Sequence, residues 1–277
     1  MSGTLYVVPT PIGNLGDISK RMADTLALAD FIAAEDTRVT VKLLNHLGLK
    51  KPMTAYHRHN ADTAGPAILK RILAGESCAL VTDAGTPAIS DPGEDLVALC
   101  AGAGVAVCAI PGPCALSTAL SVSGLPTARF TFEGFLPQNK KNRRARLDAL
   151  RGEERTMVFY EAPHKLADTL AELADTLGAD RRGVLCRELT KLHEEILRAP
   201  LGELAELFRS REPRGEFVLV VEGAAPLPEE QAGEEDALAR VEQLRAQGLS
   251  LKQACAQAAG ELGWGRRDLY QLALGKR

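Results

Sequence analysis

Short apolar runs alternate with amphipathic stretches along the first 124 residues. The apolar runs have the length of strands and lie at 4–10, 31–36, 78–82 and 105–110. Stretches with helical spacing lie between and after them, at 17–30, 37–48, 91–104 and 114–124. Strands that alternate with helices are typical of βα units on a parallel sheet. We therefore predict an α/β domain over residues 1–124.

The order of the runs changes after residue 124. Strand-like runs follow at 130–137, 156–163, 183–189, 193–200 and 216–223, with helical patterns between several of them. The runs at 183–189 and 193–200 are close enough in sequence to pair directly, which favours a mixed sheet over a parallel one. We predict a second α/β domain over residues 125–223.

The last part of the chain has a different composition. Residues 224–236, "AAPLPEEQAGEED", combine proline, alanine and acidic residues without apolar periodicity, which is typical of an exposed linker. Helical patterns follow at 237–277, where Ser250 and Gln253 have the spacing of a capping box. Three short helices joined by glycine turns resemble a helix-turn-helix domain, and we expect the single tryptophan, Trp264, to pack in its core.

Composition narrows the functional classes. The 277 residues carry a formal net charge of −3, so any contact with nucleic acid needs a local basic patch. The six cysteines include no C-x-x-C pair, which favours reduced thiols over disulfides or zinc. The sequence has neither the pattern of a signal peptide nor an apolar stretch long enough to span a membrane, so we predict a cytoplasmic protein without a membrane partner.

Three loops of small residues follow predicted strands of the first domain. They are "PTPIGN" at 9–14, "DAGTPAISDPG" at 83–93 and "PGPCALS" at 111–117. The carboxyl ends of parallel strands meet at one edge of the sheet, where α/β proteins bind ligands. Glycine lets the backbone approach a ligand closely, and proline fixes a loop in advance. The loops therefore predict a binding site, although each taken alone could be only a tight turn.

The common nucleotide-binding motifs are missing from these loops. No P-loop sequence occurs, and the G-x-G at 102–104 precedes a predicted strand instead of following one. Within the loop at 83–93 we interpret Asp83 as a brace at the end of the strand. We interpret Asp91 as the N-cap of the next helix, with Pro92 at its first position.

The chain resembles one family over nearly its whole length. The segments that carry the resemblance are "LYVVPTPIGNLGDIS", "AAEDTR", "LVTDAGTPAISDPG", "IPGPCALSTALSVSGLP", "FTFEGFLP", "FYEAPHK" and "EFVLVVEG". They are similar to the tetrapyrrole-methylase-like S-adenosylmethionine transferases, and specifically to the bacterial small-subunit ribosomal RNA (cytidine-2′-O)-methyltransferases among them.

The resemblance implies a fold, a cofactor and a reaction. The fold is the α/β, class III methyltransferase fold of two domains, with a parallel first sheet and a mixed second sheet, followed here by the small helical bundle. S-adenosylmethionine lies in the cleft between the domains, usually of a homodimer. The implied reaction is 2′-O-methylation of cytidine 1402 at the decoding centre of 16S ribosomal RNA, in the free RNA or in the small ribosomal subunit.

The resemblance also transfers cofactor-binding residues to this chain. They are Pro11, Asp83, Gly85, Thr86, Pro87, Ile89, Pro113, Cys114, Ala115, Tyr160 and Glu161. The chain departs from the family pattern at Thr86, which replaces an acidic residue, at Cys114, which replaces a serine, and at "PTPIGN", which is less rich in glycine. We therefore expect mainly backbone contacts, and carbonyl oxygens suit a cationic sulfonium.

Candidates for a catalytic base or an orienting group follow two other strands. Glu35 and Asp36 end the second predicted strand and Arg38 follows them, at the same edge of the sheet, and Glu188 lies in "CRELTK". The alternative for "EDTR" is a helix N-cap plus an ion pair, with Asp36 or Thr37 capping the helix that starts there. Positioning supplies more of the barrier reduction than a base does, so no single base is expected to be indispensable.

A basic helix provides the candidate RNA surface. Within "NKKNRRARLDALRG" the predicted RNA-binding residues are Lys140, Lys141, Arg143, Arg144 and Arg146. The alternative is a solvated helix face. His57 and His59 form an H-x-H pair without a nearby third ligand, so we predict an RNA contact or a loop role there and no metal site.

Two rival functions remain open. One is a tetrapyrrole C-methyltransferase of the same fold, although a small macrocycle needs neither the basic helix nor the C-terminal bundle. The other is a helix-turn-helix regulator whose larger part senses a small ligand.

Overall fold

The computed structural model describes residues 2–225 and 233–275. The chain divides into two compact units, Met1–Gly223 and Ala224–Arg277. Most of the predicted linker, residues 226–232, lies outside the described residues. We describe the two units separately.

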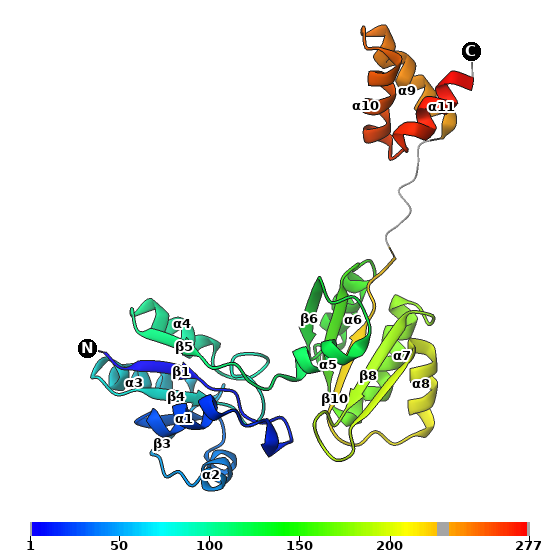
Figure 1. The fold of residues 1–277 in the computed structure, drawn as a ribbon. Helices are drawn as coiled ribbons and strands as arrows, with labels where there is room; N and C mark the ends of the chain where they lie inside the picture. Colours follow the sequence, from blue (N-terminus) through cyan, green and yellow to red (C-terminus); the bar gives the residue numbers. More distant parts are fainter. Residues whose placement is uncertain (1, 226–232, 276–277) are drawn as a thin grey trace. The chain divides into compact units, whose positions relative to one another are not determined.

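The first sheet of the larger unit is parallel, with the strand order β3-β2-β4-β1-β5 (Figure 1). Its strands are β1 (Thr4–Val7), β2 (Phe31–Ala34), β3 (Met53–Ala55), β4 (Cys78–Val81) and β5 (Ala106–Ala109). The helices between the strands are α1 (Lys20–Leu28), α2 (Thr37–His46), α3 (Ala61–Leu73) and α4 (Glu94–Gly102), with a short 3-10 turn η1 (Leu15–Asp17). The predicted parallel sheet is confirmed.

Helices cover both faces of this sheet. On one face Ile68 of α3 and Leu96 of α4 pack against Phe31 and Leu80. The other face has its own core, in which side chains of α1 and α2 pack against the alternate strand residues, including Met22, Leu44, Ile32 and Val81. The strands β2 and β4 are buried on both faces and are continuously apolar, so the loops at their ends are left to carry the chemistry.

The second sheet is mixed, as predicted, with the order β6-β7-β10-β8-β9. Its strands are β6 (Phe130–Gly134), β7 (Thr156–Glu161), β8 (Arg182–Arg187), β9 (Glu195–Pro200) and β10 (Phe217–Val221). Only β6 and β7 pair in parallel, and β8 pairs directly with β9 in antiparallel fashion. The helices that follow its strands are α6 (Lys140–Leu150), η2 (Pro163–Lys165), α7 (Leu166–Leu177) and α8 (Leu201–Ser210).

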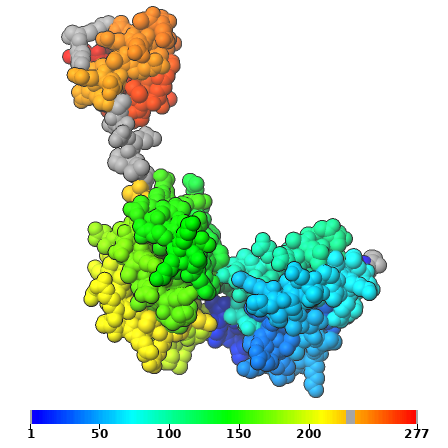
Figure 2. Space-filling model, turned by 180° about the vertical axis from the view of Figure 1, so that it is seen from behind, coloured from blue at the N-terminus to red at the C-terminus, as the bar shows by residue number. Residues whose placement is uncertain are grey.

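The helix α5 (Ala115–Ser123) follows β5 in the chain but packs on the second sheet. Its Ala119 and Leu120 lie in one core with Val158 and Val220, while α6, α7 and α8 cover the opposite face of that sheet. The boundary predicted at residue 124 assigns α5 to the first sheet. Its packing joins it to the second, so the chain crosses between the two halves before α5. Figure 2 shows these halves, blue to cyan and green to yellow, meeting over a narrow region.

The smaller unit holds α9 (Glu234–Ala246), α10 (Leu251–Leu262) and α11 (Arg266–Gly275). The predicted capping box at Ser250 and Gln253 is present. Trp264 packs against the core of this unit, as expected. The helix α9 begins at Glu234, inside the predicted linker, and its acidic first turn suits the positive end of the helix dipole. Over the described ranges no helix is long and apolar enough to cross a membrane.

Candidate active site

The three small-residue loops of the first sheet are hydrogen-bonded into one wall. Thr10 and Gly85 form an isolated antiparallel bridge, with N···O distances of 2.9 and 3.0 Å. The hydroxyl of Thr86 donates to the carbonyl of Pro113 at 2.9 Å, and the hydroxyl of Thr10 donates to the carbonyl of Thr82 at 3.0 Å. The sequence prediction that the loops share one edge of the sheet is therefore confirmed.

A cavity of about 350 Å³ opens beside this wall. It is lined by the loop after β4, the start of α5, the ends of β7 and β8, and the beginning of β10. The lining residues are Ile12, Ala84, Gly85, Thr86, Ile89, Ser90, Asp91, Cys114, Ala115, Phe135, Tyr160, Glu161, Ala162, Pro163, Cys186, Leu189, Glu216, Phe217 and Val218. A volume of this order is within the range of small-molecule sites.

The charged residues of the cavity are all acidic. Asp91, Glu161 and Glu216 belong to the lining, and no lysine, arginine or histidine does among the described residues. The site is therefore electrostatically suited to a cationic ligand and unsuited to a phosphorylated one, which needs donors and positive charge.

Glu161 is held by a buried network behind the cavity. Its carboxylate accepts from the backbone N–H of Ala162 at 2.9 Å and from the hydroxyl of Thr169 at 2.5 Å. The guanidinium of Arg143, whose side chain is 11% exposed, lies 4.0 Å from the same carboxylate. It donates to the Thr169 hydroxyl at 2.6 Å and to Glu172 at 2.5 Å.

Tyr160 joins the second sheet to α5. Its hydroxyl accepts from the backbone N–H of Leu116 at 3.0 Å, within the first turn of the helix. Burial raises the pKa of Tyr160, so the phenol stays protonated at neutral pH. Its ring makes edge contacts with Phe132 and Phe135, and Phe135 is 57% exposed at the cavity.

The loop that carries Asp91 has an unusual backbone. Ala88 and Ser90 have φ values of 67° and 68°, and Gly93 has a φ of 143°. Non-glycine residues with positive φ store strain and often mark functional sites. The loop is anchored by Arg58, which donates to the carbonyl of Ser90 at 2.7 Å.

The interpretation of Asp91 as a helix cap is wrong. The helix α4 begins at Glu94 and its N-cap is Gly93, because the chain turns through Pro92 and Gly93 before the helix starts. This leaves the Asp91 side chain free to line the cavity. Burial, followed by the nearby charge of Glu35, raises the pKa of Asp91 to about 6.

The structure brings many of the predicted cofactor residues together, but not all. Gly85, Thr86, Ile89, Cys114, Ala115, Tyr160 and Glu161 line the large cavity. Pro11 and Asp83 instead line a second cavity of about 260 Å³, together with Lys42 and His46 of α2. The loops after β1 and β4 separate the two cavities, since Ile12 lines one and Pro11 the other. Pro87 and Pro113 line neither.

None of the four predicted catalytic residues lines the large cavity. Asp36 is the N-cap of α2, accepts from the backbone N–H of Arg38 at 2.8 Å and pairs with its guanidinium. Hydrogen bonds from the side chain and the backbone of Arg38 lower the pKa of Asp36 to about 2. The alternative interpretation of this pair, a cap with an ion pair, is therefore what the structure contains, and such an acidic carboxyl is a poor base.

Glu35 and Glu188 are also engaged by neighbours. Glu35 accepts from the backbone N–H of Asp83 at 3.3 Å, and burial raises the pKa of Glu35. Glu188 accepts from the backbone N–H of Glu216 and from the ammonium group of Lys191, both at 2.9 Å. Burial alone would raise the pKa of Glu188, but these two hydrogen bonds outweigh it and lower the pKa.

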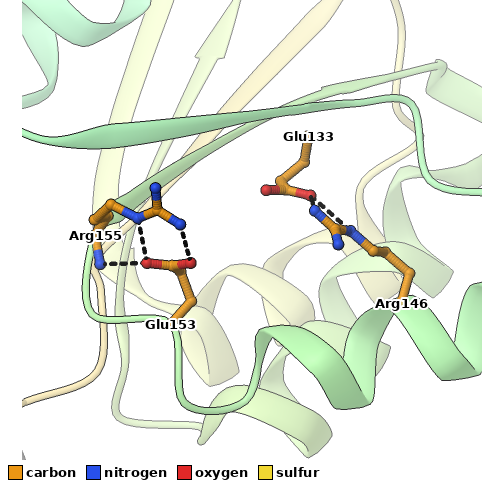
Figure 3. Close-up of polar contacts among 4 residues, drawn as sticks. All are labelled: Glu133, Arg146, Glu153 and Arg155. Atoms are coloured by element: carbon orange, nitrogen blue, oxygen red, sulfur yellow. Dashed lines mark hydrogen bonds and ion pairs between the residues drawn. The ribbon is translucent and has the colours of Figure 1, made fainter.

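Most arginines of the predicted RNA surface are paired within the protein. Arg146 binds Glu133, as Figure 3 shows beside the similar pair of Arg155 and Glu153. Arg144 binds Asp148 at 3.1 Å, and Arg143 belongs to the network behind the cavity. The patch predicted from sequence thus becomes smaller. Lys140 and Lys141 are exposed and have no ion-pair partner within residues 2–225 and 233–275.

No cluster of three histidine, cysteine, aspartate or glutamate side chains that could hold a metal occurs in the described ranges. The rings of His57 and His59 are 6.0 Å apart, in an edge contact. All six cysteines are free, and four of them are buried.

Several residues of the cavity were not predicted as site residues, among them Asp91, Phe135 and Glu216. The sequence predicts a helix cap at Asp91, and it places Phe135 and Glu216 only within strand-like segments. The signal for Asp91 was its place in the same loop as Gly85 and Thr86. No local pattern marks Phe135 or Glu216, because strands from distant parts of the chain bring them to the cavity.

The fold has counterparts among known proteins. Residues 4–205 match the family Tetrapyrrole (Corrin/Porphyrin) Methylases, and the chain belongs to that family of methyltransferases. Diphthine synthase shares the fold, with a TM-score of 0.60, 15% identity and coverage of 80% of this chain and 90% of that chain. So does a uroporphyrin-III C-methyltransferase from Thermus thermophilus complexed with S-adenosyl homocysteine, with a TM-score of 0.55, 19% identity and coverage of 79% and 97%.

More similar relatives narrow the position within the family. The chain is 47% identical over 272 residues to ribosomal RNA small subunit methyltransferase I of Synechocystis sp., covering 98% of each chain. It is 48% identical over 276 residues to the protein of that name from Pseudomonas aeruginosa, covering 99% of this chain and 97% of the other. Residues 231–277 match the RsmI C-terminal HTH domain. The chain thus groups with the ribosomal RNA small subunit methyltransferase I proteins.

Proposed function

We propose that the chain is an S-adenosylmethionine-dependent methyltransferase that 2′-O-methylates a cytidine ribose in 16S ribosomal RNA, at cytidine 1402 of the decoding centre. The relatives at 47% and 48% identity carry names that give the RNA of the small ribosomal subunit as their substrate. The family supports a methyl transfer, and a neighbour with the same fold is a complex with S-adenosyl homocysteine. The ribose position and the nucleotide come from the resemblance stated above.

The observation that carries the cofactor assignment is the charge of the large cavity. S-adenosylmethionine bears a positively charged sulfur and an ammonium group, and the charged residues of the lining are Asp91, Glu161 and Glu216. Phosphorylated cofactors would meet three carboxylates and no cation there. When bound, S-adenosylmethionine supplies a methyl group that its positive sulfur activates. The cavity therefore fits this cofactor by charge, by volume and by its backbone-lined wall.

The proposed contacts divide between the two sheets. Gly85, Thr86 and Ile89 offer backbone from the loop after β4, and Cys114 and Ala115 offer the start of α5. Tyr160 and Glu161 close the cavity from β7. The other predicted cofactor residues, Pro11, Asp83, Pro87 and Pro113, act in this proposal by shaping the loops from behind.

The proposed RNA surface begins near the cavity. Arg143 of α6 reaches the cavity residue Glu161, so the amino-terminal end of α6 lies close to the site. Lys140 and Lys141 extend from that end and are exposed. We assign the main phosphate contacts to these two lysines, because arginines already held by carboxylates must break an ion pair before they bind a phosphate. Arg144 and Arg146 are secondary contacts in this proposal.

The function is tested by transfer of a radioactive methyl group. The purified full chain is incubated with labelled S-adenosylmethionine and small ribosomal subunits, or naked 16S RNA, from a strain that lacks this enzyme. We expect label in 2′-O-methylcytidine after digestion to nucleosides, and a reverse-transcription stop at the target under limiting nucleotides. Label on a base, or no label in RNA together with label in uroporphyrinogen III, would overturn the proposal in favour of another methylase.

The cofactor site is tested separately by calorimetry with S-adenosyl homocysteine. Gly85 has a φ of 86°, so Gly85→Val forces a β-branched residue into a backbone conformation that it rarely adopts. We expect binding to fall below detection. The matched control is Gly104→Val, since Gly104 has a φ of 71° but lies in the turn after α4, away from the cavity. Equal losses in both variants would point to general unfolding and contradict the assignment.

We also propose the homodimer that the resemblance implies, and it is tested by light scattering during size-exclusion chromatography.

A further part of the proposal concerns the C-terminal helices. We propose that they contribute RNA affinity, for which Arg266 and Arg267 at the start of α11 are exposed. Specific duplex DNA binding by the full chain, lost on charge reversal of these two arginines, would favour the regulator hypothesis instead.

A further inference from the structure

Methyl transfer to a ribose hydroxyl releases a proton, which some group has to accept. The inference about that group rests on the proposed function. A general base is most effective when its pKa lies near the working pH and when it faces the reacting atoms. Such a group has to line the large cavity and to have lone pairs that no other protein group occupies. The residues predicted for this role from the sequence do not line the cavity.

The three carboxylates of the cavity differ in what already binds them. Glu161 is 5% exposed and accepts from two donors, with Arg143 beside it. Glu216 is paired with the ammonium group of Lys191 at 2.8 Å, and its side chain is otherwise turned to solvent. Asp91 alone of the three has no hydrogen-bond or ion-pair partner in the part of the chain that the structure describes.

Charged groups around Asp91 change its pKa, and one of them also holds its loop. Charged groups face it from three neighbouring loops: Glu35 after β2, Arg58 after β3 and Asp83 after β4. Tyr160 faces it from β7. Glu35 and Asp83 disfavour the ionised form of Asp91, while Arg58 favours it and also holds the neighbouring carbonyl of Ser90.

We propose that Asp91 accepts the proton of the RNA hydroxyl, as the catalytic base of the methyl transfer. The hydroxyl proton passes to a carboxylate oxygen of Asp91. The electron pair of the oxygen forms the bond to the methyl carbon, and the bond from that carbon to sulfur breaks, with its electron pair remaining on sulfur. The negative charge of Asp91 and the positive charge of sulfur thereby disappear together. Burial and Glu35 bring the pKa of Asp91 to about 6, so it is mostly ionised at neutral pH and still basic enough to act.

The strained loop gives this assignment a structural reason. Positive φ values at Ala88 and Ser90 are maintained only where the surrounding contacts determine them. Here they turn the chain so that Asp91 lines the cavity and does not cap the helix α4. A loop whose only purpose was to enter the helix would have no need for two such residues.

The catalytic test uses single-turnover methylation of small ribosomal subunits. We expect Asp91→Asn to slow the chemical step by roughly 10²–10⁴-fold, the usual contribution of general base catalysis. Binding of S-adenosyl homocysteine should persist, and Asp91→Glu should restore part of the rate. The control is Asp95→Asn, an exposed acid in the first turn of α4, which should leave the rate unchanged. A rate for Asp91→Asn within threefold of the wild type, or loss of S-adenosyl homocysteine binding, would overturn the proposal.

The pH dependence of the rate provides a second readout. The wild type should lose rate on the acid side as Asp91 becomes protonated, with the limb centred at about pH 6. Because Glu35 raises the pKa of Asp91, Glu35→Gln should move this limb to lower pH. An unmoved limb in Glu35→Gln, or the same limb in Asp91→Asn, would assign the titration to another group and refute the proposal.

A third readout needs no RNA, and it separates this inference from the proposed function. If Asp91 faces the reacting methyl, the cationic sulfur of S-adenosylmethionine favours its ionised form, whereas neutral S-adenosyl homocysteine does not. The affinity of the first ligand relative to the second should therefore rise between pH 5 and about 7 in the wild type, and stay flat in Asp91→Asn. A flat wild-type ratio would refute the placement of Asp91. Failure of the wild type to methylate 16S RNA, with the ratio as expected, would refute the proposed function alone.

Discussion

Arg143 belongs to the basic helix predicted to bind RNA, but in the structure its side chain is mostly buried and paired within the protein. The contribution of these contacts to the free energy of unfolding can be measured by mutation. The guanidinium of Arg143 binds the Thr169 hydroxyl and Glu172, and it lies 4.0 Å from Glu161. The change Arg143→Ala removes these contacts and the packing of the arginine stem. Arg144, the next residue, makes an exposed i,i+4 pair with Asp148 and serves as the matched control.

The expected magnitude follows from burial. Breaking a buried ion pair typically destabilises a protein by about 3–5 kcal/mol. The loss should be smaller here, about 2–3 kcal/mol, because Glu161 keeps two other donors and Glu172 is about half exposed. The exposed pair of Arg144 is worth only about 0.3–0.5 kcal/mol. With a urea m-value of about 2–3 kcal/mol per molar, Arg143→Ala lowers the unfolding midpoint by about 1 M.

The assay is urea unfolding followed by circular dichroism at 222 nm. Fluorescence of the single tryptophan is unsuitable, since Trp264 lies in the smaller unit and reports on that unit alone. We also expect Arg143→Ala to weaken S-adenosyl homocysteine binding, because Glu161 loses its support beside the cavity. An Arg143→Ala protein as stable as Arg144→Ala, with weakened RNA binding alone, would refute the structural role and restore Arg143 to the RNA surface.

Three other outcomes are expected. Asp36→Asn keeps the helix cap and should retain stability and methylation, whereas Asp36→Ala should lower the free energy of unfolding, measured by denaturation, by about 1 kcal/mol. Loss of methylation in a stable Asp36→Asn protein would restore a catalytic role for Asp36. Folding raises the pKa of Asp91 from 3.8 to about 6, which penalises the ionised folded form. Asp91→Asn should therefore be more stable than the wild type above about pH 6, and this advantage should vanish toward pH 4; an equal difference at both pH values in urea titrations would contradict the shift. Charge reversal of Lys140 and Lys141 should weaken RNA binding and reduce the slope of log affinity against log salt by about 1 per lost phosphate contact, while Lys70→Glu on α3 leaves the slope unchanged.

The fold was predictable because local patterns determine it. Continuous apolar strands separated by helices indicated the parallel sheet, and the short gap between 183–189 and 193–200 indicated the antiparallel pair. The sequence patterns did not predict β3 or α3, and they misplaced α5. The sequence of α5 continues the strand-helix alternation, but its apolar residues Ala119 and Leu120 are buried against the second sheet. The partner of a helix is decided by tertiary packing, which periodicity alone does not reveal.

The charged residues were harder to assign, because the role of a charge depends on its partners. "NKKNRRARLDALRG" is basic as a sequence, yet Arg143 and Arg146 are bound by Glu172 and Glu133, which lie elsewhere in the chain. Counting charges in a segment cannot detect carboxylates that arrive from other elements. Within the described residues of this segment, Lys140 and Lys141 are exposed and keep the positive charge that a count of its basic residues predicts.

The same reasoning applies to the loop at 83–93, where Gly85 and Thr86 line the cavity but Asp91 does not cap the helix α4. Small residues after a strand, such as Gly85 and Thr86, are a local signal of such a loop. Asp91 before a proline also fits a local pattern, that of a helix cap, but the cap position went to Gly93. Its actual environment is made by Glu35 and Arg58, each from a different loop at the same sheet edge. Burial, followed by the charge of Glu35, raises the pKa of Asp91, while Arg58 lowers it, and no local pattern contains these influences. A local motif therefore predicts where the chain turns, while the chemistry of the turning residue is set by the topology that collects its neighbours.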